Sequence, residues 1–214
     1  MIITIDGPAG SGKSTVARAL ARRLAFRFID TGAMYRTVAL AGIRRAVDWQ
    51  QPDQLAELAA KIEIRVDGPR TLLDGEDVSE KIRGSEVTAA TRHAADNPLI
   101  REHLVRLQRE VAGDDNVVTE GRDQGTVAFP HAQYKFFVTA SPEERARRRL
   151  GDLQSRGESA TLEEVMAAQQ RRDQEDSSRK IGPLAAAADA IEVCTDGMTV
   201  EEAVDRLEEI VALP

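Results

Sequence analysis

The sequence reads Gly7-Pro8-Ala9-Gly10-Ser11-Gly12-Lys13-Ser14 near its start and matches the pattern G-x-x-x-x-G-K-[ST] at every position. In such a loop the glycines let backbone N–H groups turn inward around phosphate oxygens. Lys13 then reaches the β- and γ-phosphates, and the Ser14 hydroxyl ligates Mg²⁺. The Ile-rich residues 1–6 predict a short buried strand before the loop, and apolar residues recur at helical spacing after it. Strand, phosphate loop and helix in this order predict a nucleotide-binding site.

The rest of the chain alternates short apolar stretches with amphipathic ones. Further strands are expected at 26–30, 117–119 and 134–139. Helix starts are marked by the N-cap and N1 pair Asn97-Pro98 and by capping boxes at Ser141 to Glu144, Thr161 to Glu164 and Thr199 to Glu202. Strands that alternate with helices predict an α/β fold with a central parallel, doubly wound sheet.

Residues 62–84 differ in character from the rest of the chain. Ile62, Ile64 and Val66 alternate with charged residues, and turn residues such as Asp74-Gly75 follow them. This pattern is typical of short, half-exposed antiparallel strands. We therefore expect a core made of residues 1–61 and 85–214, interrupted by a small antiparallel β insertion at 62–84.

Composition excludes several classes of protein. The chain of 214 residues suits one domain of ordinary size, and its 42% apolar residues suit a globular one. With 29 Lys and Arg against 36 Asp and Glu, the net charge of −7 disfavours binding to long nucleic acid, which needs many contacts with phosphates. No apolar run approaches the ~20 residues of a membrane span, and the N-terminus is unlike a signal peptide. A cytoplasmic location is expected.

The single cysteine and the histidines indicate no site. Cys194 has no second cysteine with which to form a disulfide, and the apolar stretch 191–194 predicts that it is a buried strand residue. His93, His103 and His131 lie at no spacing that metal ligands use.

Asp30-Thr31-Gly32-Ala33-Met34-Tyr35-Arg36 follows a predicted strand, where ligands approach an open α/β sheet. Thr31 can donate a hydroxyl hydrogen bond, Gly32 permits a close backbone approach, and Arg36 can hold a phosphate bidentately. The alternative is an ordinary strand–helix turn with a solvated arginine.

Glu120-Gly121-Arg122-Asp123 follows another predicted strand. The carboxylate of Glu120 is placed to hold Mg²⁺ or its waters, as the acid of a Walker B strand does. Arg122 can bind phosphate, and Asp123 can accept a hydrogen bond from an exocyclic amine. The alternative is a charged loop with internal ion pairs.

Arginines crowd two predicted helices. They are Arg145, Arg147, Arg148 and Arg149 in the first, and Arg172 and Arg179 in the second, where Asp176 completes an i, i+4, i+7 set on one face. Spacing alone is equally typical of solvated faces with one helical ion pair. A kinase needs arginines, however, because charge must be neutralised as a phosphoryl group transfers. The polar residues 151–159 suit a mobile lid, which we expect within 150–180.

A phosphate loop indicates nucleotide binding but leaves the reaction open. GTPases normally carry a guanine-reading N-K-x-D motif, which the sequence lacks. The chain is also short for a motor or recombinase ATPase. Its size therefore favours a small-molecule kinase.

Six blocks of the sequence resemble bacterial cytidylate kinases in order and spacing, and the likeness extends over nearly the whole chain. The blocks are IDGPAGSGKST, DTGAMYR, DGEDVSEKIR, EGRDQGTVAFP, SPEERARRR and RRDQEDSSRKIGPL. DTGAMYR and GRDxGT separate this group from adenylate and thymidylate kinases. The resemblance implies a three-layer P-loop NTPase fold that transfers the γ-phosphoryl group of ATP to CMP or dCMP, giving ADP and CDP or dCDP.

The resemblance also implies roles for individual residues. ATP would be bound by Gly7, Pro8, Ala9, Gly10, Ser11, Gly12, Lys13, Ser14, Thr15 and Arg149. CMP would be bound by Thr31, Arg36, Arg101, Arg122, Asp123, Arg172, Asp176 and Arg179. The catalytic residues would be Lys13, Arg36, Arg122 and Arg179, and Mg²⁺ would be held by Ser14 and Glu120. Within these sets Arg101 and Asp123 would read cytosine, and an Asp123 that accepts from the 4-amino group would reject UMP.

Two residues depart from the family pattern. Glu120 stands where relatives often have Asp, and Arg92 stands where relatives have a serine that contacts cytosine. Thr88 and Thr91 are the candidates to replace that serine. The insertion 62–84 is expected to close over the monophosphate.

Three other functions compete with this interpretation: a kinase for UMP or a non-nucleotide metabolite, an RNA-linked ATPase, and a non-catalytic nucleotide sensor. The excess of acidic over basic residues and the 4% aromatic content argue against the RNA-linked ATPase. The expected partners are ATP and CMP or dCMP, without a nucleic acid polymer or a membrane, and the chain is expected to be a monomer.

Overall fold

The computed structural model describes residues 1–68, 70–155 and 157–212 and divides the chain into two compact units. The first unit comprises Met1–Phe28 and Asn116–Pro214, and the second comprises Ile29–Asp115. The second unit therefore contains the expected insertion 62–84 together with helices on both sides of it. Pro69 of the expected insertion and Arg156 of the expected lid lie outside the described residues.

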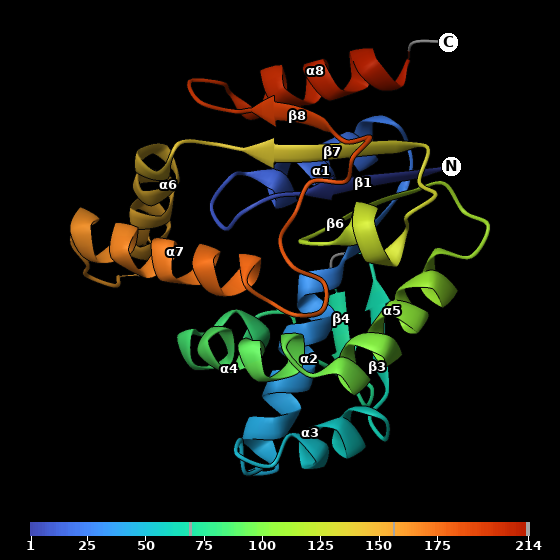
Figure 1. Ribbon diagram of the computed structural model, residues 1–214, viewed down its shortest axis with the longest axis vertical. Coiled ribbons are helices and arrows are strands. Elements are labelled where there is room, and N and C mark those ends of the chain that lie inside the picture. Colours follow the sequence, from blue (N-terminus) through green and yellow to red (C-terminus); the bar gives the residue numbers. More distant parts are fainter. Residues whose placement is uncertain (69, 156, 213–214) are drawn as a thin grey trace. The chain divides into compact units, whose positions relative to one another are not determined.

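A five-stranded sheet has the strand order β2-β6-β1-β7-β8, and four of its strands, β6, β1, β7 and β8, lie wholly in the first unit (Figure 1). The strands are β1 (Ile2–Asp6), β2 (Arg27–Asp30), β6 (Val117–Gly121), β7 (Tyr134–Thr139) and β8 (Ile191–Cys194). β1 pairs in parallel with β6 and β7, and β7 pairs in parallel with β8. The predicted central parallel sheet is confirmed.

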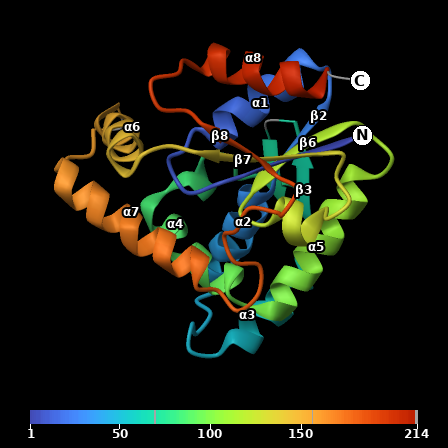
Figure 2. The same cartoon turned by 45° about the horizontal axis from the view of Figure 1, so that its top comes forward.

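Side chains of β1 alternate between the two faces of this sheet, as a strand requires. Ile3 and Ile5 are fully buried in a core with α1 (Lys13–Arg23) and α8 (Val200–Val211), which pack against each other (Figure 2). Thr4 and Asp6 are also buried, but they lie on the opposite face. Because the side chain of Asp6 is shielded from solvent, it needs polar partners, and these come from the segment that follows β6.

Helix caps begin the later helices of this unit largely as predicted. Thr161 and Thr199 each form a complete capping box, at the start of α7 (Leu162–Ser177) and α8. At α6 (Pro142–Ser155) the Ser141 hydroxyl accepts from the Glu144 amide at 3.3 Å, while the Glu144 carboxylate pairs with Arg148 at 3.0 Å. α6 and α7 pack together and fill most of 150–180, the range expected to form a lid.

The second unit is built around α2 (Thr31–Arg44), with a small antiparallel sheet of strand order β3-β4-β5. Its other elements are α3 (Pro52–Ala59), β3 (Ile64–Asp67), β4 (Arg70–Leu73), β5 (Glu76–Asp77), the 3₁₀ helix η1 (Lys81–Arg83), α4 (Ser85–Ala95) and α5 (Pro98–Ala112). Asn97 caps α5 as predicted, since its side chain accepts from the amides of Leu99 and Ile100. The antiparallel insertion predicted from alternating residues is confirmed.

One prediction about the first unit is wrong: Cys194 is exposed. β8 is an edge strand of the sheet, and only Val193 of its four residues is buried. An apolar run therefore overstated the burial of this strand. None of the helices among the described residues combines the length and apolar character that a membrane span needs.

Candidate functional site

The phosphate loop joins β1 to α1 through two glycines with different roles. Gly12 is the N-cap of α1 and adopts φ 84° and ψ −3°, a left-handed conformation that glycine reaches without strain. Gly7 lies so close to β7 that a Cβ added to it would be 2.0 Å from the carbonyl oxygen of Val138. The loop thus ends at the N-terminus of an 11-residue helix, which favours bound phosphate.

Two arginines of α6 hold the outer side of this loop. The Arg145 guanidinium donates to the carbonyl of Ala9 at 3.1 Å, and the Arg148 guanidinium donates to that of Ser11 at 3.3 Å. The hydroxyl of Thr195 also donates to the Ser11 carbonyl, at 3.1 Å. In a trans peptide group the N–H points opposite to the C=O, so the amides of Gly10 and Gly12 face away from these donors, as a phosphate cradle requires.

Arg149 of α6 is the arginine of this cluster that the sequence predicts to bind ATP, and it is partly buried. Arg145 and Arg148 were recognised as basic, but their contacts with the loop were missed. A signal existed in their i, i+3 spacing, which places both on one face of the helix.

Gly7→Ala is expected to abolish ATP binding while Gly151→Ala raises stability. At position 7 the new methyl group would overlap the Val138 carbonyl, so either the loop or β7 must move. At position 151, within α6, a Cβ would meet nothing within 4 Å, and alanine favours a helix by about 1 kcal/mol. ATP titration and thermal unfolding of both variants check this; ATP affinity unchanged in Gly7→Ala would contradict it.

Lys13 is the first residue of α1 and is 6% exposed. Its Nζ lies 4.0 Å from a carboxylate oxygen of Glu120 and donates to the Pro8 carbonyl at 3.3 Å. Burial lowers the pKa of Lys13 below its usual range, and Arg122 and Arg172 lower it further against the attraction of Glu120. A phosphate bound beside Lys13 would favour the charged form of this lysine.

Asp176, near the end of α7, holds two of the predicted arginines. Arg122 Nε donates to one of its carboxylate oxygens at 2.7 Å, and Arg179 pairs with the other at 2.6 Å. Burial opposes its charge, but the guanidiniums of Arg122, Arg179 and Arg172 together keep the pKa of Asp176 below its usual range. The predicted helical face of Arg172, Asp176 and Arg179 is only partly correct, because α7 ends at Ser177 and Arg179 lies beyond it.

The segment after β6 forms a short π-helix, η2 (Gln124–Ala128), which the sequence did not predict. Asp6 accepts from the amide of Gln124 at 2.9 Å and from that of Gly125 at 2.8 Å. Burial raises the pKa of Asp6 to about 7, although these two N–H groups favour its charged form. Asp123 is the N-cap residue of η2 and is 5% exposed.

The protein groups predicted to hold Mg²⁺ are few. Among residues 1–68, 70–155 and 157–212, no three or more His, Cys, Asp or Glu side chains cluster as a metal site. The hydroxyl of Ser14, on α1, and the carboxylate of Glu120, on β6, fit an ion that takes one or two protein oxygens and otherwise phosphate and water.

In the second unit Asp30 ends β2 and caps α2 by accepting from the Ala33 amide at 2.9 Å. The same carboxylate pairs with Arg36 at 3.2 Å and with Arg83 at 3.6 Å. Two guanidiniums on one carboxylate leave a net positive charge beside Thr31, at the start of α2. This is a suitable place for an acceptor phosphate.

Arg101 on α5 is 4% exposed and belongs to the same unit. Its guanidinium lies 5.6 Å from the centre of the Tyr35 ring and donates to the Ala95 carbonyl at 3.2 Å. The hydroxyls of Thr88 and Thr91, the candidates for base contact, donate to the carbonyls of Gly84 and Val87. Each hydroxyl therefore retains only its acceptor capacity toward a ligand.

Arg92 neighbours a pair of stacked rings on the second unit. His93 and Trp49 lie with ring centres 4.8 Å apart at 23°. Burial lowers the pKa of His93, and the charge of Arg92 lowers it further. Because the folded state binds its proton less readily than the unfolded state, this histidine stabilises the fold above pH 6.5 and loses that contribution as the pH falls.

Arg92→Ser is therefore expected to raise the midpoint of the His93 titration. Removal of the neighbouring positive charge makes the imidazolium less unfavourable. The emission of Trp49, the single tryptophan, reports the state of the stacked ring between pH 4 and 8. Arg22→Ser on the other unit serves as the control. A midpoint that stays in place or falls would contradict the assignment.

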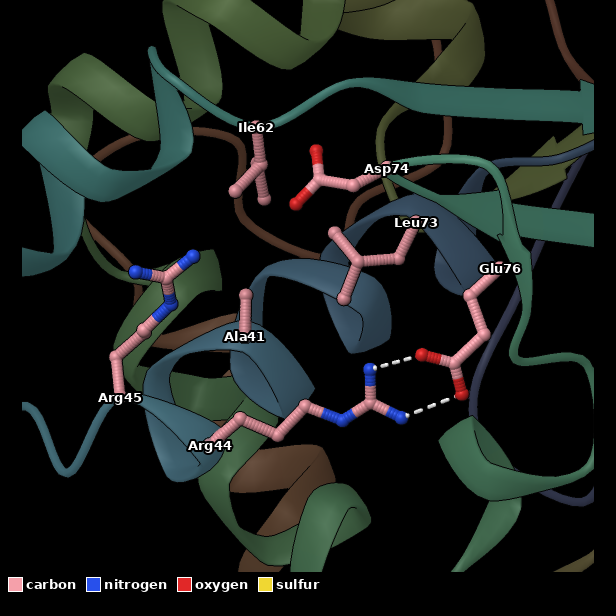
Figure 3. Close-up of a pocket in the computed structure, with 7 residues that line it drawn as sticks. All are labelled: Ala41, Arg44, Arg45, Ile62, Leu73, Asp74 and Glu76. Carbon is pink, nitrogen blue, oxygen red and sulfur yellow. Dashed lines mark hydrogen bonds and ion pairs between the residues drawn. The ribbon is translucent and has the colours of Figure 1, made fainter.

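A separate cavity of about 160 Å³ lies in the second unit, between the end of α2 and the small sheet (Figure 3). Its lining residues are Ala41, Arg44, Arg45, Ile62, Leu73, Asp74 and Glu76. Arg44 donates to both carboxylate oxygens of Glu76, at 2.8 and 2.9 Å, and Lys81 donates to Glu76 at 2.6 Å. These donors lower the pKa of Glu76 to about 2. The cavity contains none of the predicted ligand-binding residues.

Comparison with known proteins extends over almost the whole chain. The family described as cytidylate kinase matches residues 3–213. A cytidylate kinase of Rhodopirellula baltica is 50% identical over 94% of this chain and 88% of its own length. One from Caldanaerobacter subterraneus subsp. tengcongensis is 47% identical over 98% of this chain and 93% of its own, and one from Mycobacterium avium is 46% identical over 99% and 95%.

Solved structures bear on the fold alone. A shikimate kinase from Bacteroides thetaiotaomicron aligns with a TM-score of 0.51 and 18% identity, covering 100% of this chain and 99% of its own. An uncharacterised protein from Eubacterium ventriosum aligns with a TM-score of 0.54 and 13% identity, covering 99% and 97%. The shared feature is a parallel sheet with helices, consistent with the predicted P-loop fold.

Proposed function

Since the chain belongs to the cytidylate kinase family, we propose that it transfers the γ-phosphoryl group of ATP to CMP or dCMP. The observation that carries this proposal is the group of charged side chains around Lys13 in the first unit. Beside the phosphate loop, the charges of Arg122 and Arg172 lower the pKa of Lys13, while the carboxylates of Glu120 and Asp176 raise it. Such a concentration of cations suits several phosphates held together.

ATP binding would rest on the phosphate loop. The loop amides and the N-terminus of α1 would hold the β- and γ-phosphates, with Lys13 between them. Arg145 and Arg148 would keep the loop in shape through its carbonyls rather than touch ATP. Mg²⁺, held by Ser14 and Glu120, would offset the negative charge on the phosphates.

CMP binding would involve its phosphate, its sugar and its base. Arg36 and Arg122 would hold the acceptor phosphate, and Arg172 and Asp176 would contact the sugar. To do so, Arg36 would exchange its 3.2 Å contact with Asp30 for phosphate oxygens. Arg101 and Asp123 would read cytosine, each already buried and therefore selective for a partner that satisfies it.

The chemistry would depend on position and charge. A phosphate oxygen of CMP is already an anion at neutral pH, so the attack on the γ-phosphorus needs no strong general base. Lys13 and the arginines would stabilise the charge that spreads over the transferring group. We also propose that the enzyme acts as a monomer in the cytoplasm.

The test is an assay of ADP release with ATP and Mg²⁺ in which CMP, dCMP, UMP and AMP are offered separately. Turnover with CMP and dCMP and little with the others is the expected result. Turnover with UMP but not CMP would support the assignment as a P-loop kinase but contradict the proposed roles of Arg101 and Asp123 in base recognition. Without turnover on any acceptor, an ATPase or a nucleotide sensor would be the better account.

A further inference from the structure

We propose that Asp6 is a positioning residue that holds the segment Arg122–Asp123 in the geometry needed for the acceptor nucleotide. The inference rests on the proposed function, because it concerns how CMP is selected. Asp6 ends β1, one residue before the phosphate loop, and it is 3% exposed. Its side chain points away from the loop's helix, to the face of the sheet opposite Ile3 and Ile5.

Both carboxylate oxygens of Asp6 are used. One accepts from the amide of Gln124 at 2.9 Å, and the other accepts from the amide of Gly125 at 2.8 Å. These are the first two amides of η2, and a helical segment has no carbonyl of its own to accept from its first N–H groups. Asp6 thus provides the partners that the start of this segment requires.

Further hydrogen bonds and one close backbone approach also hold this segment in place. The Asp123 carbonyl accepts from the amides of Val127 and Ala128, at 2.8 and 3.2 Å. Thr119 donates its hydroxyl to the side chain of Gln124 at 2.9 Å. Gly125 approaches β1 so closely that a Cβ there would be 3.0 Å from the hydroxyl of Thr4. A small shift at Gln124 would therefore move Asp123 and Arg122 with it.

A carboxylate is needed here because two parallel N–H donors face it. An asparagine has one acceptor oxygen, and its amide group would point a third donor at the second N–H. One buried amide would then lose its partner, and the segment would relax to satisfy it. The consequence falls on the acceptor nucleotide, because the phosphate loop keeps its own contacts with Arg145 and Arg148.

The experiment compares wild type, Asp6→Asn and Thr119→Val by steady-state kinetics and by hydrogen exchange. For Asp6→Asn we expect the KM for CMP to rise about 10- to 100-fold, the effect of one lost buried hydrogen bond on this scale. The KM for ATP should change less than about threefold, and the preference for CMP over UMP should fall at least about tenfold. Amides within 122–128 should exchange faster, while those of 7–15 should not.

Thr119→Val tests the same segment from β6, away from the phosphate loop, and should shift KM for CMP in the same direction by a smaller factor. If Asp6→Asn does not fold, the kinetics and hydrogen exchange of Thr119→Val test the proposal by themselves. Asp48→Asn is the matched control, because Asp48 accepts from the amide of Gln50 at 3.0 Å in an exposed turn. The control should leave every quantity unchanged.

Two results would overturn the inference. One is a folded Asp6→Asn variant with unchanged exchange at 122–128 and unchanged KM for CMP. The other is equal loss of ATP and CMP affinity, which would assign Asp6 to the phosphate loop. If wild type accepts UMP in place of CMP, the proposed function fails, but hydrogen exchange and the KM for UMP still decide the role of Asp6.

Discussion

Lys13→Met lowers kcat with CMP by at least about 10²- to 10³-fold and leaves the fold intact, if the proposed mechanism is correct. Methionine fills the volume of the lysine stem but carries no charge. The site then loses the cation that would stabilise the transferring phosphoryl group. The effect should appear in kcat more than in the KM for CMP, because Lys13 would act on the γ-phosphate rather than on the acceptor.

Circular dichroism and thermal unfolding establish that the Lys13→Met variant is folded before its rate is measured. Lys61→Met is the control for the substitution itself, since Lys61 forms an exposed pair with Glu57 on α3 at 3.7 Å. It should retain wild-type turnover. Near-normal turnover in Lys13→Met would remove Lys13 from the mechanism.

Asp123→Asn is expected to lower kcat/KM for CMP by about 10- to 100-fold and to bring the CMP and UMP values close together. Asp123 is 5% exposed, so a hydrogen bond gained or lost there has little competition from water. Aspartate presents only acceptors and would match the 4-amino group of cytosine. Asparagine also presents an N–H donor, which matches the 4-oxo group of uracil.

Separate titrations of CMP and UMP at saturating ATP give kcat/KM for each nucleotide, and the ratio of the two values measures the preference for CMP. Asp115→Asn, near the chain boundary between the units, controls for the loss of one acidic charge in the same part of the sequence. An Asp123→Asn enzyme that keeps the full wild-type preference for CMP would show that cytosine is read elsewhere.

The sequence predicted the elements of this fold where local chemistry determines them. The phosphate loop, the Asn97 cap and the boxes at Thr161 and Thr199 each depend on residues within a few positions of one another. The alternation at 62–66 likewise predicted a half-exposed antiparallel strand. The exposure of Cys194 could not be predicted in this way, because it depends on which strand occupies the edge of the sheet.

The sequence predicted which residues belong to the candidate site better than it predicted which of them contact one another. Arg122 and Asp176 were both named, but their 2.7 Å pair joins residues 54 positions apart and has no local signature. The same holds for Arg145 and Ala9, which are 136 positions apart. The π-helix after β6 also depends on a distant residue, Asp6, since its first amides bind that carboxylate.

The exposed edge strand β8 has a practical consequence. Cys194 is the single thiol of the chain and lies in the first unit, while Trp49 is the single indole and lies in the second. A dye attached at Cys194 would therefore be the unique energy acceptor for a unique intrinsic donor, without any engineered residue. Energy transfer between them would report in real time whether the distance between these two residues changes as ATP and the acceptor bind.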